Sequence, residues 1–232
     1  MTLKPEFITR MRQLHRPTMG TEVMSPLLYW LIRFIRARRV LEIGGGYSSL
    51  FILKALADNV TQHKIEVESS QSRTHPYFHA DYYNTKYAPC LHTIDLLCHP
   101  QTSANLVEST AKELQLESYL HFHRADFRGY SKHFKLPFDF VWMDAGSWEF
   151  YLAFFNEYWK LIDPDGGIWL IHSTQTNVQG LDFVERLKKM QLKGTEEFEL
   201  VSFLEPHKFS QNSFTLVRRT SKLKRRVYSQ QA

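Results

Sequence analysis

The feature that most constrains this chain is an apolar run that breaks on three consecutive glycines, the segment RVLEIGGGYSSL at residues 39–50. The residues from Val40 to Ile43 suit a buried strand, whereas glycines allow positive φ angles and a close approach of the backbone to other groups. Ser48 or Ser49 can then cap a helix, because apolar residues recur behind them at helical spacing. The segment therefore predicts a strand, a tight turn and a helix, with amides of the turn open to a ligand.

Composition sets limits on the fold and the compartment. The chain has 232 residues, of which 43% are hydrophobic and 14% aromatic, enough to bury a substantial core as one domain. Its most apolar N-terminal run, residues 25–35, contains Arg33 and is followed by Arg36, so it is too short and too charged for a membrane span or a signal peptide. We therefore expect a soluble, cytoplasmic protein without membrane association.

Cys90 and Cys98 are the only two cysteines of the chain. If the residues between them are extended, their Cα atoms lie roughly 25 Å apart, which is beyond the reach of a disulfide. We therefore expect reduced thiols and no metal site built on cysteines.

The formal net charge of +5 raises the question of nucleic-acid binding, because basic residues cluster at residues 33–39 and 218–226. Both clusters lie at the ends of predicted elements, and neither is interleaved with a run of aromatics on which bases stack. The sequence therefore favours solvated basic surfaces over a nucleic-acid site. It is also compatible with a homodimer.

Strand-like and helix-like segments alternate along the rest of the chain. The expected strands after the first are residues 91–96, 119–124, 138–144 and 168–172, and the expected helices between and after them are about 101–116, 148–162 and 182–191. Such alternation implies an α/β fold with a mostly parallel sheet and helices on both faces. The last two strands, 198–204 and 213–218, are joined by a short loop, which predicts an antiparallel edge pair.

This pattern divides the chain into three parts. Residues 1–38 are predicted to form an N-terminal helical cap, residues 39–220 the α/β domain that binds the ligand, and residues 221–232 a basic tail. Residues 60–89 are rich in histidine and tyrosine but lack clean periodicity. Since connections in such folds usually run about 2–6 residues, we interpret this segment as an inserted flap that covers the site.

Acidic residues follow or end four of the expected strands: Glu42, Asp95, Asp126 and Asp144. Ligands bind beyond the carboxyl ends of the strands in parallel sheets, so these side chains should surround one crevice. A ribose diol needs a paired acceptor, which Asp95 offers at the end of the second strand. An adenine amino group needs an acceptor one strand further along, which Asp126 offers.

Several motifs resemble those of class I S-adenosylmethionine-dependent methyltransferases, over roughly residues 22–219. They are VLEIGGGYS at 40–48, TID at 93–95, RAD at 124–126, FDFVWMD at 138–144 and LIDPDGG at 161–167. The last two are similar to signatures of small-molecule O-methyltransferases of the catechol and caffeoyl-coenzyme A type. The resemblance implies a Rossmann-like, seven-stranded sheet with an antiparallel last strand, and S-adenosylmethionine as the cofactor.

The resemblance also assigns residues to the cofactor. Asp95 is expected at the ribose and Asp126 on the adenine side. The other expected cofactor-binding residues are Glu42, Gly44, Gly46, Tyr47, Ser48, Asp144 and Trp148.

The chain departs from this pattern where catechol-type enzymes hold a divalent metal. Asp144 is present, but His172 and Ser173 stand where an Asp-Asn pair would follow the fifth strand. Because a hard cation prefers oxygen ligands, we expect no metal at this site. The basic residue that usually follows the fourth strand is also missing, and so is the Asp/Asn-Pro-Pro-aromatic run typical of enzymes that methylate amino groups of nucleic-acid bases.

The catalytic candidates are Tyr82, Tyr83, Asp144 and His172. Aromatic faces attract a sulfonium by cation–π interaction, although Tyr82 and Tyr83 can equally anchor the flap to the core. His172 can be a base or a buried histidine of the core. The predicted reaction is metal-independent methyl transfer to a small molecule. The alternative is cyclisation of S-adenosylmethionine by its own α-amine, which gives azetidine-2-carboxylate and methylthioadenosine, and a third option is a non-catalytic relative.

Overall fold

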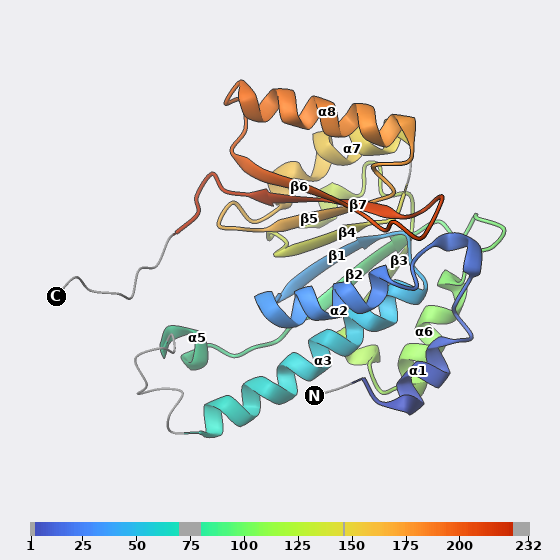
Figure 1. Cartoon of the computed structure of the whole chain (residues 1–232). Helices are drawn as coiled ribbons and strands as arrows, with labels where there is room; N and C mark the ends of the chain where they lie inside the picture. Colours follow the sequence, from blue (N-terminus) through green and yellow to red (C-terminus); the bar gives the residue numbers. More distant parts are fainter. Residues whose placement is uncertain (1–2, 70–79, 146, 225–232) are drawn as a thin grey trace.

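A computed structural model describes residues 3–69, 80–145 and 147–224 of the chain (Figure 1). The basic tail predicted at 221–232 and the middle of the predicted flap therefore fall largely outside the described residues. Within them, the described helices include none that is long and apolar enough to cross a membrane.

The described strands form one seven-stranded sheet in the order β3-β2-β1-β4-β5-β7-β6 (Figure 1). The strands are β1 (Arg39–Ile43), β2 (Cys90–Asp95), β3 (Leu120–Arg124), β4 (Phe140–Met143), β5 (Ile168–His172), β6 (Phe198–Leu204) and β7 (Ser213–Arg219). Strands β1 to β5 are parallel, and β7 pairs antiparallel with both β5 and β6. This confirms the α/β class, the Rossmann-like sheet and its antiparallel last strand. Of the predicted edge pair, only β6 lies at the edge.

Helices cover both faces of the sheet, as expected (Figure 1). On one face lie α1 (Pro5–Met11), α2 (Met24–Ile35), α3 (Tyr47–Glu68) and α6 (Val107–Glu113), and on the other α7 (Trp148–Tyr158) and α8 (Val178–Leu192). Neighbouring residues of β1 enter different cores, since Val40 packs with the first group and Leu41 with the second. A strand buried on both faces needs apolar residues at successive positions, which explains the apolar run that precedes the glycines.

The N-terminal segment packs on α3. Phe7 of α1 contacts Phe51 of α3 edge to face, with ring centroids 5.2 Å apart. Helix α2 begins at Met24, and Ser25 donates its hydroxyl to the carbonyl of Thr21 at 2.7 Å, so Ser25 lies inside the helix. The loop between α1 and α2 brings Met19, in a 3-10 turn (Pro17–Met19), over the carboxyl ends of the strands.

The prediction of a flap over residues 60–89 is wrong in its first part, because α3 continues without a break to Glu68. Its second half packs beside α2, where Arg33 donates to Asn59 at 2.6 Å and Arg36 pairs with Glu66 at 2.6 Å. These polar contacts stabilise a helix whose sequence lacks clean amphipathic spacing. Residues 70–79 lie outside the described residues, and α5 (Ala80–Asn84) follows them.

Candidate active site

Three adjoining hollows lie at the carboxyl ends of the parallel strands, and all three share Met19 and Asp144. The wide hollow, of about 320 Å³, is lined by residues such as Gly44, Asp95, Asp126 and Phe150. The polar hollow, of about 300 Å³, is lined by residues such as His99, Gln101, His172, Asn177 and Gln211. The narrow hollow borders the glycine turn, and its lining includes Arg16, Gly46, Tyr47 and Ser48. The structure therefore gathers most of the predicted strand-end residues around one crevice.

The glycine turn brings the backbone of β1 against that of β4. Gly44 has a φ of 89°, and a Cβ placed on it would lie 2.8 Å from the carbonyl oxygen of Asp144. A larger residue would therefore be strained and would also push the two strand ends apart. The amide of Gly45 donates to Asp95 Oδ2 at 2.8 Å, and that of Gly46 to Ser49 Oγ at 2.9 Å.

Glu42 is the buried centre of this turn and does not line any of the three hollows. Its carboxylate accepts hydrogen bonds from Ser48 Oγ at 2.6 Å, Ser49 Oγ at 2.5 Å and Thr93 Oγ1 at 2.8 Å. Burial raises its pKa to about 7, although the three hydroxyl donors oppose this shift. The prediction that Glu42 binds the cofactor is therefore corrected: its carboxylate holds the turn together from inside.

Asp95 lines the wide hollow, where the sequence predicted it. Its Oδ2 accepts from the amide of Gly45, and its Oδ1 accepts from the amide of Leu97 at 2.5 Å. The carboxylate thus fixes both its own turn and the glycine turn. Each carboxylate oxygen has a further lone pair, so a bidentate contact with a diol is still open to Asp95.

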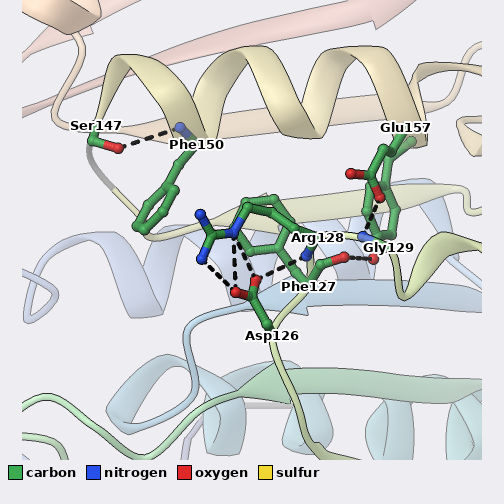
Figure 2. A network of polar contacts seen from close by, with 8 residues as sticks. Asp126, Phe127, Arg128, Gly129, Ser147, Phe150 and Glu157 are labelled. Carbon is green, nitrogen blue, oxygen red and sulfur yellow. Dashed lines mark hydrogen bonds and ion pairs between the residues drawn. The ribbon is translucent and has the colours of Figure 1, made fainter.

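Asp126 also lines the wide hollow, but its carboxylate is paired with Arg128 (Figure 2). Arg128 Nε donates to both carboxylate oxygens at 3.0 Å, and its guanidinium lies 5.2 Å from the ring centre of Phe150. The hydrogen bonds from Arg128 lower the pKa of Asp126, despite the opposing effect of burial. Arg128 was not among the predicted residues, although its position two residues after Asp126 indicates that the two can form an ion pair.

Asp144 and His172 form an ion pair at the ends of β4 and β5. Parallel register places Met143 beside Ile171, so the two residues that follow lie side by side. His172 Nδ1 lies 2.7 Å from Asp144 Oδ1, and the His172 side chain is 1% exposed against 20% for Asp144. Burial lowers the pKa of His172, but the charge and hydrogen bond of Asp144, with the backbone of Gln211, outweigh burial and raise it above 6.5.

Of the two aromatic residues expected at the cofactor, Tyr47 lies at the crevice and Trp148 does not. Tyr47 contributes to the narrow hollow, but its ring packs between His15 and Phe51, at 5.5 and 5.1 Å. Trp148 packs edge to face on Phe183 of α8, at 6.1 Å, and does not line the hollows.

The start of α7 explains the displacement of Trp148. Ser147 caps the helix by accepting from the amide of Phe150 at 3.2 Å (Figure 2). The ring of Phe150, two residues after Trp148, reaches the wide hollow instead. Residues two apart in a helix point to different sides, and the sequence gives no indication of which side faces the crevice.

Tyr82 lies beside Arg38, at the amino end of β1, and Tyr83 packs beside Tyr82, so both are at the opposite end of the strands from the crevice, which contradicts their predicted place over the cofactor. Both rings contact His63 of α3, at centroid distances of 5.5 and 5.8 Å, and Arg38 lies 5.4 Å from the ring centre of Tyr82. Arg38 immediately precedes β1, and the glycine turn follows β1, about 20 Å further along the strand direction. The tyrosines therefore pack on α3 and do not form a lid.

Further residues of the crevice come from loops that carried no motif in the sequence. They are Met19, His99, Gln101, Thr102, Asn177 and Gln211. Gln211 has a φ of 52°, and its backbone would lie within 2.7 Å of a Cβ on Gly20, so the N-terminal loop packs tightly against the loop between β6 and β7. No pattern along the chain predicts this contact between residues far apart in sequence.

Comparison with known proteins supports the assignment of this fold. The sequence profile of a family described as "Methyltransferase domain" matches residues 41–174, more than half of the 232-residue chain. None of the curated proteins compared with the chain matches it in sequence.

Among solved structures, the chain is similar to the O-methyltransferase TomG of Streptomyces achromogenes, which is involved in tomaymycin synthesis and was crystallised with S-adenosylmethionine. The two are 22% identical with a TM-score of 0.65, over 95% of this chain and 92% of TomG. An O-methyltransferase of Bacillus cereus, in complex with S-adenosylhomocysteine, is 15% identical with a TM-score of 0.63, over 95% and 93% of the two chains. These likenesses concern the fold. With the match to the family profile, they confirm the resemblance in the motifs: the chain belongs to the methyltransferase-domain family, among the S-adenosylmethionine-dependent methyltransferases.

Proposed function

We propose that this protein transfers the methyl group of S-adenosylmethionine to a hydroxyl group of a small molecule, without a divalent metal ion. The observation that carries the proposal is the position of Asp144. It lines all three hollows and is hydrogen-bonded to His172 at 2.7 Å. Asp144 therefore lies where a methyl donor in one hollow would meet an acceptor in the next.

The cofactor would occupy the wide and narrow hollows. Asp95 would accept from the ribose hydroxyls, and the adenine would lie beside Phe150 with Asp126 and Arg128 at its edge. The methionine end would reach the narrow hollow, where Arg16 is suited to its carboxylate and the glycine turn allows close approach. Similar structures crystallised with S-adenosylmethionine or S-adenosylhomocysteine support the choice of cofactor.

The acceptor would enter the polar hollow. Its lining offers amide and imidazole groups of Gln101, Asn177, Gln211 and His99, which suit a hydroxylated molecule. A volume of about 300 Å³ lies at the lower end of ordinary small-molecule sites. These features favour a small, polar acceptor.

The Asp144–His172 pair would take up the proton released by the reaction. As the O–CH₃ bond forms, the S–CH₃ bond breaks and the acceptor O–H gives up its proton. With His172 neutral, the pair can accept this proton and become an imidazolium beside a carboxylate. Because Asp144 raises the pKa of His172, this product state is favoured.

The residues at the ends of β4 and β5 do not fit a magnesium ion. His172 is 2% exposed and is turned towards Asp144. Of this pair, only the Asp144 carboxylate offers oxygen ligands, whereas a hard cation needs several. An aromatic flap over the cofactor would also suit the cyclisation alternative, but Tyr82 and Tyr83 lie on α3 instead. No described residue favours that reaction.

The proposed activity is tested by incubating the protein with S-adenosylmethionine and a panel of hydroxylated small molecules. We expect S-adenosylhomocysteine to form only when an acceptor is present, together with the methyl ether. Methylthioadenosine formed without any acceptor would instead identify the cyclase. Methyl transfer confined to amines or thiols would overturn the hydroxyl assignment.

We predict that Asp95→Asn weakens binding of S-adenosylmethionine by about 1.5–3 kcal/mol, roughly a tenfold to hundredfold change, because a neutral amide replaces a charged acceptor of two hydroxyls. Isothermal calorimetry measures the effect. The matched control is Asp182→Asn, at an exposed position of α8. Equal affinities for the wild type and Asp95→Asn would remove Asp95 from the cofactor site.

We also predict that methyl transfer continues after a chelator has removed divalent metal ions, because the Asp144–His172 pair stands where metal ligands would otherwise lie. Turnover should change less than twofold after dialysis against EDTA, measured with and without added Mg²⁺. Loss of turnover that Mg²⁺ restores, and Zn²⁺ does not, would show a hard-cation site in the crevice and contradict metal independence.

A further inference from the structure

A second cluster of reactive side chains lies outside the crevice, at the edge formed by β2 and β3. Cys90 and His92 are two residues apart on β2 and therefore point to the same face. Parallel register places His121 of β3 directly beside His92. The methyltransferase mechanism uses none of these residues. Cys90 begins β2 and Asp95 ends it, so along the strand Cys90 lies about 17 Å and His92 about 10 Å from the crevice.

The ligand atoms of these three residues already lie close together. Cys90 Sγ is 3.6 Å from His92 Nε2, and one ligand atom from each of Cys90, His92 and His121 falls within 4.8 Å of the others. Zinc at about 2.3 Å from sulfur and 2.0 Å from nitrogen, in a tetrahedron, places the two ligands about 3.6 Å apart. The first pair therefore matches this spacing, and the exposed His121 offers the third ligand atom.

A chain of hydrogen bonds behind His92 fixes its orientation. His92 Nδ1 lies 3.0 Å from His123 Nε2, and His123 Nδ1 lies 3.0 Å from the hydroxyl of Tyr130. If His92 Nε2 binds a cation, its Nδ1–H donates to His123, and the Nδ1–H of His123 donates to Tyr130. One set of tautomers thus satisfies every bond. Metal-bound histidines typically have such an outer partner.

Two groups of opposite charge, Arg39 and Asp139, lie near the Cys90 thiol. A bound cation would deprotonate the thiol, because a metal-bound sulfur is a thiolate.

We propose that Cys90, His92 and His121 form a binding site for a thiophilic transition-metal ion, with Zn²⁺ as the best-suited ion and solvent at the fourth position. One thiolate and two imidazoles are borderline-soft ligands, which suit Zn²⁺ and exclude Mg²⁺ or Ca²⁺. The expectation that the cysteines form no metal site considered only the spacing of Cys90 and Cys98 along the chain. The proposed site needs a single cysteine and two histidines from neighbouring strands.

Cobalt titration tests the site without any methyl-transfer assay. Reduced, metal-free protein without a histidine tag should bind one equivalent of Co²⁺, with a thiolate-to-cobalt charge-transfer band that Zn²⁺ abolishes. Cys90→Ser should lose the band, and His121→Ala should weaken Co²⁺ binding at least tenfold. His123→Phe removes the outer partner and should weaken binding by about 10–100-fold. The matched controls, Cys98→Ser and His207→Ala, should bind as the wild type.

Absence of the band in the wild type would overturn the proposal, and so would a band that persists in Cys90→Ser. Stoichiometric binding that His121→Ala leaves unchanged would do the same, since His121 is exposed and its loss spares the core. We expect His121→Ala to fold, which circular dichroism checks, so the test stands even where Cys90→Ser fails to fold. The result is independent of the proposed methyl transfer.

Discussion

Asp144→Asn should lower kcat for methyl transfer by about 10²–10⁴-fold, the usual contribution of a positioned proton acceptor. Asparagine keeps the shape of the side chain but lacks the charge that favours a proton on His172. The measurement is steady-state turnover with an acceptor from the hydroxylated panel. Asp182→Asn, on the exposed surface of α8, is the control for a change of one aspartate.

The pH dependence separates a proton acceptor from a structural ion pair. In the wild type, activity should rise as pH increases through the pKa of His172, which lies above 6.5, because only the neutral imidazole can take up a proton. In Asp144→Asn, burial acts without the opposing carboxylate, so the pKa of His172 falls and the acid limb moves to lower pH. Titration of His172 by NMR, with its signal assigned through His172→Gln, follows the same shift without an acceptor. An unchanged pKa in Asp144→Asn would contradict the coupling.

Glu42→Ala should destabilise the fold by about 3 kcal/mol or more, although Glu42 touches none of the hollows. The variant removes the shared acceptor of Ser48, Ser49 and Thr93 and leaves three buried hydroxyls to find other partners. Chemical denaturation measures the loss. Thr93→Val removes one donor only and should cost less, so equal losses in the two variants would show that the hydroxyl network is not the cause.

Glu42 also makes stability depend on pH, with a sign opposite to that of most carboxylates. Its pKa is about 7 in the folded protein against 4.5 for the free side chain, so the folded state prefers the protonated form. This contribution is complete below pH 4.5 and is lost as pH rises towards 7, on the order of 3 kcal/mol in total. Glu42→Gln cannot ionise. The free energy of unfolding of the wild type, relative to Glu42→Gln, should therefore fall over this range, and a constant difference would contradict the shift.

The order of elements in the sheet could be predicted because local patterns report it. Apolar runs such as residues 40–43 and 168–171 mark strands buried on both faces, and the helices between them force parallel connections. The ends of those strands then identify Asp95, Asp126 and Asp144 as neighbours. The strand Ile168–His172 has the bounds expected from its sequence. Where backbone hydrogen bonding and burial follow a fixed period, the sequence is enough to predict the elements and their order.

Side-chain direction was beyond this kind of prediction. Glu42 lies one residue before the end of β1, beside Thr93 and two positions short of Asp95 in the register, and it points to three hydroxyls inside the protein while Asp95 lines the wide hollow. Trp148 and Phe150 differ in the same way at the start of α7. Each choice depends on partners from other elements, and a strand or helix period fixes only alternate faces, not what covers them.

The α/β sheet, its family and the strand ends that carry acids could be predicted from the sequence, because these follow from apolar periodicity, glycines and charge along a continuous stretch. The pairing of Asp144 with His172, the packing of Tyr82 and Tyr83 on α3 and the meeting of Cys90 with two histidines are visible in the folded chain alone. Each of these contacts joins residues from separate segments. Their positions depend on how the layers pack, which is set by burial of the whole core and not by any local pattern.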